Sequence, residues 1–165
     1  MKKYEFTGET KEIRLLFRTA TLHRIRATVA FGIVEVGDLG GWIEKEENLS
    51  HEGKAWVCGN AEVCGNAEVW GNAKVCGNAK VFSASHVLVI GAIGSRNDFT
   101  TFYRDKDNEI TVKCGCFLGK IDRFLEKVTQ THGDSKYALV YRAAVEVAKL
   151  QIDLSGEAPK DADEE

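Results

Sequence analysis

Residues 57–86 read VCGNAE VCGNAE VWGNAK VCGNAK VFSASH, a period of six residues that occurs five times in succession. Valine opens every unit, and alanine or serine stands four places after it. A period of six fits neither an α-helix, with 3.6 residues per turn, nor a plain alternating strand. Glycine adopts left-handed backbone conformations without strain, so the Gly-Asn pairs favour tight turns. The stretch therefore predicts short strands separated by Gly-Asn turns.

Three units of six make an eighteen-residue coil, and successive coils of a solenoid stack by parallel strand pairing. Val63 is then expected to stack on Val81, and Glu62 is expected to form a minor surface pair with Lys80. The order of aliphatic residue first and small residue fifth resembles the hexapeptide repeat of left-handed parallel β-helices. The predicted fold class is mainly β: a short left-handed parallel β-helix with an N-terminal β cap and a C-terminal ββαα module.

The residue after each valine faces outward in such a coil, and most of these residues are apolar. The predicted interface residues are Cys58, Cys64, Trp70, Cys76, Phe82 and Leu88. Exposed apolar patches mark interfaces, and the fold is compatible with a three-fold axis, so a homotrimer is predicted. No apolar leader follows Lys2 and Lys3, which predicts a cytoplasmic protein whose five cysteines are reduced thiols.

The chain of 165 residues is divided by its patterns into four segments. Residues 1–42 are the expected cap, 43–94 the β-helix, 95–152 an α+β module and 153–165 an acidic disordered tail. The module is predicted to hold strands at 99–104 and 109–113, then two helices. The expected inward face of the last helix is Leu139, Ala143, Val147 and Leu150, with Val140 and Ala144 nearby. A net charge of −3 argues against general nucleic-acid binding, and no apolar stretch is long enough to cross a membrane.

A more specific resemblance rests on GDLGGWIEKEENLS at residues 37–50, followed by the Gly-Asn-Ala repeats. With IGSRN at 93–97, CGCF at 114–117 and THGD at 131–134, it covers about residues 4–150. The chain resembles hexapeptide-repeat proteins of the GNAxVxGNAxV type, which tailed phages and prophages encode. The resemblance implies a phage protein in the host cytoplasm. It also implies a role such as countering a host defence, by sequestering a nucleotide-like signal or by binding a host protein.

The turn after residue 94 carries the polar cluster that best suits a small anionic ligand. Arg96 is expected to bind a phosphate while a tyrosine of the last helix stacks on a base. The predicted ligand-binding residues are Ser95, Arg96, Asn97, Thr100, Thr101, Lys136, Tyr137 and Tyr141. The alternative is a capped turn that satisfies only its own backbone. Arg24 and Arg26 are secondary anion candidates, unless they are solvated arginines of the cap.

Two other classes of function remain open in the sequence. One is a CoA-dependent acyltransferase, the enzyme class most associated with left-handed β-helices, in which His86 would be the general base. The other is a structural assembly protein. No cofactor is predicted. Cys114 and Cys116, with His132 as the one nearby histidine, supply too few ligands for zinc, so buried structural thiols are expected and no metal site is predicted.

Overall fold

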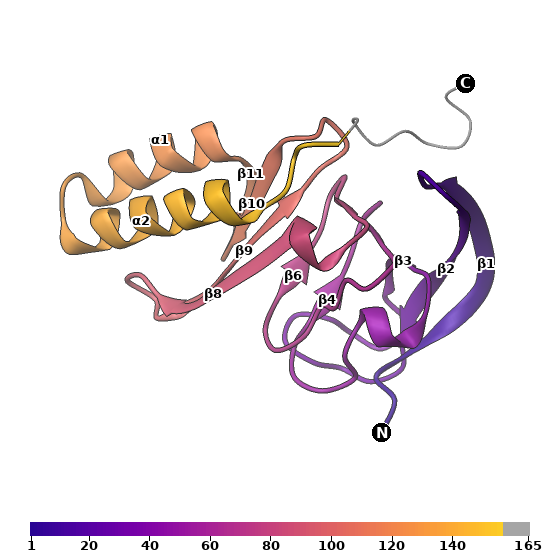
Figure 1. Ribbon diagram of the computed structural model, residues 1–165. Coiled ribbons are helices and arrows are strands. Elements are labelled where there is room, and N and C mark those ends of the chain that lie inside the picture. The colour runs from indigo at the N-terminus through magenta and orange to yellow at the C-terminus, as the bar shows by residue number, and fades with distance from the viewer. Residues whose placement is uncertain (157–165) are drawn as a thin grey trace.

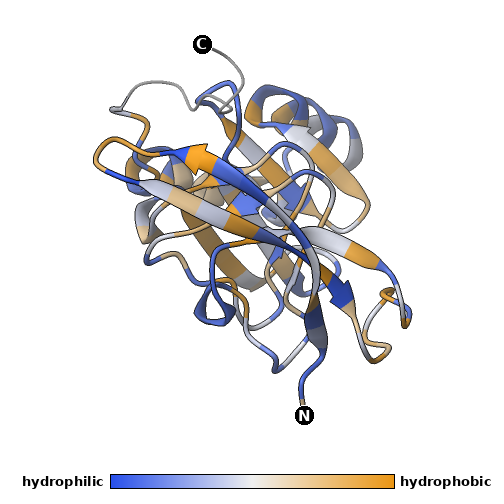
Figure 2. Cartoon of the chain, turned by 90° about the vertical axis from the view of Figure 1, so that its right-hand side faces the viewer, coloured by the Kyte–Doolittle hydropathy of each residue, from blue (hydrophilic) through white to orange (hydrophobic). Residues whose placement is uncertain are grey.

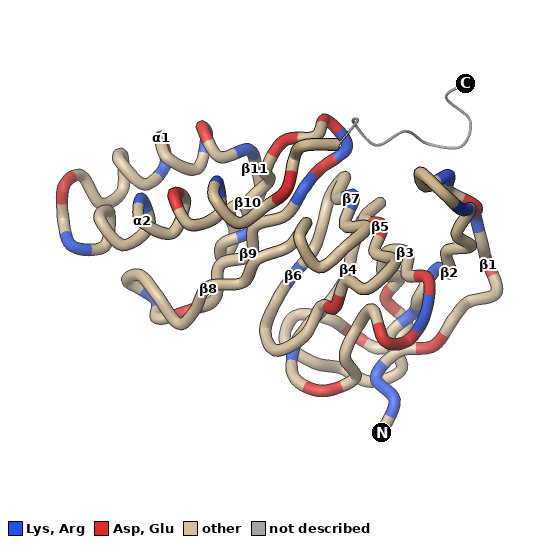
Figure 3. Tube along the Cα trace, in the orientation of Figure 1, with Lys and Arg blue, Asp and Glu red and all other residues tan. Residues whose placement is uncertain are grey.

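The computed structural model describes residues 1–156, which form three sheets and two α-helices. The acidic segment predicted at 153–165 therefore lies mostly outside the described residues. Figure 1 shows the N-terminal hairpin at one end of the molecule, the short strands of the repeat in the middle, and the helices at the other end. Lys and Arg are interspersed with Asp and Glu among the N-terminal strands and around the C-terminal sheet and helices (Figure 3).

The first sheet joins the N-terminal hairpin to the repeat in the order β1-β2-β3-β5-β7. Its strands are β1 (Tyr4–Arg14), β2 (Thr19–Ala27), β3 (Leu39–Ile43), β5 (Glu62–Val63) and β7 (Lys80–Val81). The pairs within β1-β2-β3 are antiparallel, and those within β3-β5-β7 are parallel. Two further short strands, β4 (Trp56–Val57) and β6 (Lys74–Val75), make a separate parallel sheet. Figure 2 shows hydrophilic and hydrophobic segments alternating along the hairpin strands, as expected for strands with one covered face.

The C-terminal part is a four-stranded antiparallel sheet with two helices on one face (Figure 1). Its strands are β8 (Val87–Ile93), β9 (Asp98–Arg104), β10 (Ile110–Cys114) and β11 (Phe117–Lys120), in the spatial order β11-β10-β9-β8. The helices are α1 (Ile121–His132) and α2 (Lys136–Gln151), and short 3-10 helices occupy Glu46–Asn48 and Ala84–His86.

The predicted fold class is wrong. Residues 1–156 form a five-stranded mixed sheet, a two-stranded parallel sheet and a four-stranded antiparallel sheet with two helices, not a left-handed parallel β-helix. The expected cap continues one of the sheets that contains the repeat, and the expected ββαα module has two additional strands, β8 and β11. The reason is that the six-residue period determines only the turns and the pairing of strands that lie eighteen residues apart. The hairpins outside the repeat decide which sheet each pair joins.

The local predictions for the repeat are confirmed at the level of residue pairs. Val63 pairs with Val81 and Glu62 with Lys80, eighteen residues apart. The repeat glycines all have left-handed backbone, with φ of 65° or 66°. The Glu62–Lys80 pair is buried rather than on the surface, because the β1-β2 hairpin covers it. Lys80 and Lys11 lie 2.7 and 2.6 Å from the Glu62 carboxylate, so the buried charge is paired.

Strand β9 is buried on both faces and joins the two halves of the molecule. Phe102 packs into the cluster beneath the helices, whereas Tyr103, its neighbour, packs into the cluster of the repeat. The Tyr103 hydroxyl donates to the Cys76 carbonyl at 2.9 Å and accepts from the Cys76 amide at 3.3 Å. Because successive side chains of a strand point to opposite faces, the single strand β9 contributes side chains to both cores.

The residues predicted as an outward apolar face are mostly covered by the chain itself. Cys64 is fully buried with Trp42 beneath the β1-β2 hairpin, and Cys76 is buried against β9. Cys58, Phe82 and Leu88 are half-buried, which leaves Trp70, 67% exposed, as the one fully exposed member of the set. The set therefore does not form one continuous exposed patch, and the homotrimer stays a prediction.

The cysteines differ from the expectation of five reduced thiols. Cys58 and Cys76, one period of eighteen apart, form a disulfide, and Cys64, Cys114 and Cys116 are free. Parallel pairing of β4 and β6 places the two Cα atoms 4.6 Å apart, within the range that a disulfide spans.

The face of α2 that packs on the sheet is also not the predicted one. The buried residues are Ala138, Tyr141, Ala144, Val145 and Ala148. The predicted inward set of Leu139, Ala143, Val147 and Leu150 is exposed instead, although Ala144, predicted to lie near that face, is buried. Both sets follow helical spacing, so periodicity could not choose between them. The small residues face inward because they allow the helix to lie close to its neighbours.

Candidate functional site

A cavity of about 360 Å³ lies at the end of the C-terminal sheet, between two strand turns and both helices. Its lining comes from the β8-β9 turn at 95–98, the β10-β11 turn at 114–117, α1 and one residue of α2. Ser95, Arg96 and Tyr141, three of the predicted ligand-binding residues, line it together. The predicted pocket was expected between the β-helix and the C-terminal module, whereas this cavity is lined only by residues of the C-terminal part. Ligand binding at these residues stays a prediction.

The backbone of the β8-β9 turn is shaped to bring Arg96 beside the cavity. Gly94 and Asn97 both have left-handed backbone, at φ of 80° and 49°, and the Asn97 amide donates to the Gly94 carbonyl. A Cβ atom on Gly94 would stand 1.8 Å from the Tyr141 hydroxyl oxygen. Glycine is therefore required here both for its conformation and for the close approach of α2.

Two basic side chains line the cavity without an acidic partner. Neither Arg96 nor Lys127 has a carboxylate within ion-pair distance in the part of the chain that the structure describes. The Arg96 guanidinium lies against Gly115, where an added Cβ would meet its Nη1 at 2.9 Å. The one acid of the lining, Asp98, accepts a hydrogen bond from the Phe99 amide at 2.7 Å. The net charge of the lining favours an anion.

Aromatic rings form the floor of the cavity. Phe124 stands at its centre, with its ring centroid 5.4 Å from Phe117 and 5.7 Å from Tyr141. His132 stacks on Tyr141 with centroids 5.8 Å apart. Edge-to-face and stacked aromatic contacts hold such rings in fixed positions, so the apolar part of the lining is made of rings that are fixed at angles to one another.

A thiol and a phenol lie side by side behind the basic residues. The Thr100 hydroxyl donates to Cys114 Sγ at 3.4 Å, and burial, followed by the neighbouring Cys114, raises the pKa of Tyr141. Tyr141 is therefore a neutral hydrogen-bond donor at neutral pH. Cys116 is exposed at the mouth of the cavity. Among residues 1–156, no group of three His, Cys, Asp or Glu side chains has an arrangement that could hold a metal ion.

The other predicted ligand-binding residues do not line this cavity. Thr100 and Thr101 are buried within β9, where Thr101 accepts from the Lys74 amide at 3.1 Å on the side of the repeat. Asn97 is an exposed turn residue, and Lys136 and Tyr137 are exposed on the first turn of α2. The Tyr137 ring contacts His132 from outside.

The secondary candidates are held by local contacts. Arg24 donates to the Gly40 carbonyl at 2.7 Å and lies over the Trp42 ring, and Arg26 pairs with Glu5 at 2.6 Å. His86 accepts a hydrogen bond from the Phe82 amide through Nδ1. Burial, followed by the charge of Arg104, lowers the pKa of His86 to about 4.

Sequence reasoning missed the contribution of α1 to the cavity. Together with the strand turns, the lining residues that were not predicted are Asp98, Cys114, Gly115, Cys116, Phe117, Phe124, Lys127, Val128, Thr131 and His132. Those from α1 lie three or four places apart and so share one helix face. That spacing was visible in the sequence. Helical spacing alone does not distinguish a face that lines a cavity from a face that packs in the core, because Lys127 and Thr131 adjoin the apolar Phe124 and Val128.

Comparisons with known proteins add no family to this description. No protein-family model matches the chain, and a search of curated proteins finds no match. None of the described helices is long and apolar enough to cross a membrane.

Proposed function

We propose that the protein is a non-enzymatic binding protein that sequesters a small anionic, nucleotide-like ligand in the cavity between the strand turns and the helices. The observation that carries this proposal is the pairing of two basic side chains without acidic partners, Arg96 and Lys127, with an aromatic floor. Arg binds phosphate and carboxylate groups through two parallel hydrogen bonds, and its planar group suits a fixed site.

The dimensions of the cavity fit this class of ligand. A volume of about 360 Å³ is within the usual range for small-molecule sites, which combine mostly apolar walls with a few polar groups. In the proposed complex, the anionic group lies between Arg96 and Lys127. A flat ring of the ligand then lies against the aromatic side chains of the lining.

Acyl transfer gains no comparable support from the geometry. His86, the proposed base, lies outside the cavity, and its Nδ1 is already an acceptor for a backbone amide. In the phage setting that the sequence resemblance implies, sequestration of a signalling nucleotide would counter a host defence. We retain that setting as part of the proposal.

The test is native mass spectrometry of freshly purified protein, followed by calorimetric titration with adenosine 5′-monophosphate. We expect a bound mass or a measurable dissociation constant, and we expect Arg96→Gln to raise that constant at least tenfold, since hydrogen bonds to charged groups contribute about 1.5–3 kcal/mol. Lys136→Gln is the matched control, because this exposed lysine lies outside the cavity. Equal affinity of Arg96→Gln and the parent protein, or no binding at millimolar ligand, would contradict the proposal.

A further inference from the structure

A second cavity, of about 350 Å³, lies where three parts of the chain meet. Its walls come from the segment between β2 and β3 together with the first residue of β3, from the two-stranded sheet of β4 and β6, and from β10. It shares no lining residue with the first cavity. Nothing in the sequence patterns identified it, because its residues come from segments that do not share a period.

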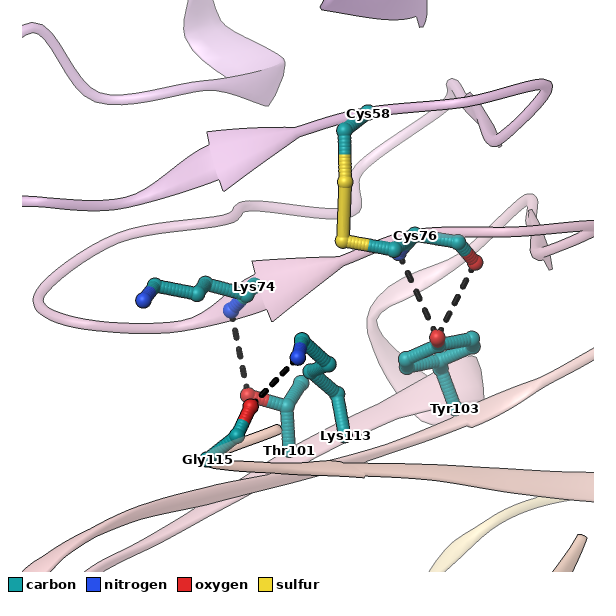
Figure 4. Close-up of a disulfide and its surroundings, with 7 residues drawn as sticks. All are labelled: Cys58, Lys74, Cys76, Thr101, Tyr103, Lys113 and Gly115. Atoms are coloured by element: carbon teal, nitrogen blue, oxygen red, sulfur yellow. Dashed lines mark hydrogen bonds between the residues drawn. A yellow bond between two sulfur atoms is a disulfide. The ribbon is translucent and has the colours of Figure 1, made fainter. Parts of the chain in front are cut away.

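The inner wall of this second cavity is apolar and rigid. Phe31 and Trp56 meet edge to face with centroids 5.2 Å apart, and the Cys58–Cys76 disulfide continues the same wall. Figure 4 shows the disulfide joining neighbouring strands, with Tyr103 of β9 hydrogen-bonded to Cys76. Covalent and hydrogen-bond links on both sides of the wall fix its shape before any ligand arrives.

Three lysines, Lys54, Lys74 and Lys113, surround this apolar wall. None of them has a carboxylate within ion-pair distance among the described residues. The one acid in the lining, Asp38, accepts a hydrogen bond from the Glu35 amide at 2.9 Å. The lining therefore combines an apolar interior with an excess of positive charge.

Lys74 of β6 and Lys113 of β10 are close enough for their charges to interact. The Lys74 amide donates to Thr101 Oγ1 at 3.1 Å, and Lys113 Nζ donates to the Gly115 carbonyl (Figure 4). Burial, followed by the charge of Lys74, lowers the pKa of Lys113. Like charges repel, so an anion placed among these ammonium groups would relieve an unfavourable interaction as well as form new ones.

Two exposed apolar residues extend the wall outward. Ile33, in the segment between β2 and β3, is 86% exposed, and Leu39, the first residue of β3, is 55% exposed. A ligand with a body longer than the cavity would cover them. Burying such side chains is favourable by about 25 cal/mol per Å² of apolar surface.

We infer that this second cavity is a binding site for a small amphipathic anion, with an apolar body against Phe31 and Trp56 and a carboxylate or phosphate held by Lys54 and Lys74. The inference is independent of the proposed function, because the two cavities have different linings. Charge complementarity at the rim and the apolar interior together define the ligand class.

The experiment is a titration of ¹⁵N-labelled protein with 2-naphthoate, followed by amide chemical shifts, with 2-naphthalenemethanol as the uncharged counterpart. We expect naphthoate to shift the amides of Phe31, Val34 and Trp56, and the alcohol to bind at least tenfold more weakly. The double variant Lys54→Gln/Lys74→Gln should raise the naphthoate dissociation constant about tenfold. Raising the salt concentration should weaken binding of naphthoate but not of the alcohol.

Two controls keep the inference falsifiable. Lys45→Gln/Lys136→Gln removes the same number of charges from exposed positions outside the cavity and should leave affinity unchanged. If the Lys54→Gln/Lys74→Gln protein lost its native amide spectrum, each single variant would replace it, with about a threefold effect expected. Equal binding of alcohol and naphthoate, shifts confined to residues 95–98 and 127–132, or no shift at millimolar naphthoate would each overturn the inference. Titration with adenosine 5′-monophosphate tests the proposed function separately.

Discussion

The repeat and the C-terminal sheet are built by different means. The repeat contributes only valine and alanine to its core, at fixed spacing from two-residue strands, and its shape depends on glycines at the turns. Neighbouring segments complete that core with larger side chains such as Tyr4, Trp56 and Tyr103. The core beneath the helices mixes Phe102, Phe124 and Tyr141 with aliphatic residues on longer elements. The two cavities lie where other segments meet: one between the strand turns and the helices, the other where the repeat borders residues 31–39 and β10. The difference indicates that the repeat supplies the frame and that binding sites form at its junctions and beyond it.

The largest expected effect concerns the turns of the repeat. Gly65 and Gly71 have the same left-handed backbone, at φ of 66° and 65°. A Cβ on Gly65 would stand 2.6 Å from the Phe82 carbonyl oxygen, but one on Gly71 would meet nothing within 4 Å. We expect Gly65→Ala to lower the free energy of unfolding by about 3–4 kcal/mol and Gly71→Ala by about 1 kcal/mol. Denaturant unfolding measures both, and equal effects would show that stacking of the turns is not tight.

The next effect concerns the disulfide that ties two layers of the repeat together. The disulfide links two residues with a sequence separation of 18, so its reduction should lower the free energy of unfolding by about 3 kcal/mol. Unfolding with and without a phosphine reductant measures this. The variant Cys58→Ser/Cys76→Ser is the control and should show no response to the reductant. A response of the same size in that variant would assign the effect to something other than this bond.

His86, which lies where the repeat meets the C-terminal sheet, should make the free energy of unfolding depend on pH. Burial, followed by Arg104, lowers the pKa of His86 to about 4, so the folded state binds a proton less readily than the unfolded state. Neutral His86 makes its full contribution to the free energy of unfolding above the pKa of the unfolded state, near 6.5. This contribution is lost as the pH falls towards 4. We expect a loss of about 2 kcal/mol over that range, allowing for partial solvent exposure. The variant His86→Gln should show a shallower dependence between pH 6.5 and 4, and an identical dependence would contradict the assignment.

The smallest expected effect tests which face of α2 is packed. Val145 is fully buried and Val147 is 47% exposed, although both belong to the same helix. We expect Val145→Ala to lower the free energy of unfolding by about 2 kcal/mol and Val147→Ala by less than 0.5 kcal/mol. The reverse order would favour the face that periodicity alone suggested.

The two regions also differ in how much of them the sequence could predict. The period of six was sufficient to predict that Val63 pairs with Val81 and that the glycines have left-handed backbone, because both are local consequences of the repeat. It was misleading about the fold class, because the sheet that β5 and β7 join depends on β3 and its antiparallel partner β2.

The candidate site shows the same limit. Arg96 and Tyr141 could be predicted from a turn and a helix that follow the repeat. Lys127 and His132 could not be separated from ordinary helix residues, since their role depends on how α1 lies against the β10-β11 turn. The second cavity depends on contacts among three distant segments, and no single stretch of sequence contains that information.

The central claim is that the cavity between the strand turns and the helices binds an anion, while the repeat acts as a frame. The most direct measurement is the change in amide chemical shifts when adenosine 5′-monophosphate is added to ¹⁵N-labelled protein. The account predicts that the largest shifts occur at residues 95–98, 114–117 and 127–132 and that residues 59–79 of the repeat do not respond. In Arg96→Gln, the same shifts should require at least tenfold more ligand. Shifts centred on the repeat, or a spectrum that does not change at millimolar ligand, would contradict it.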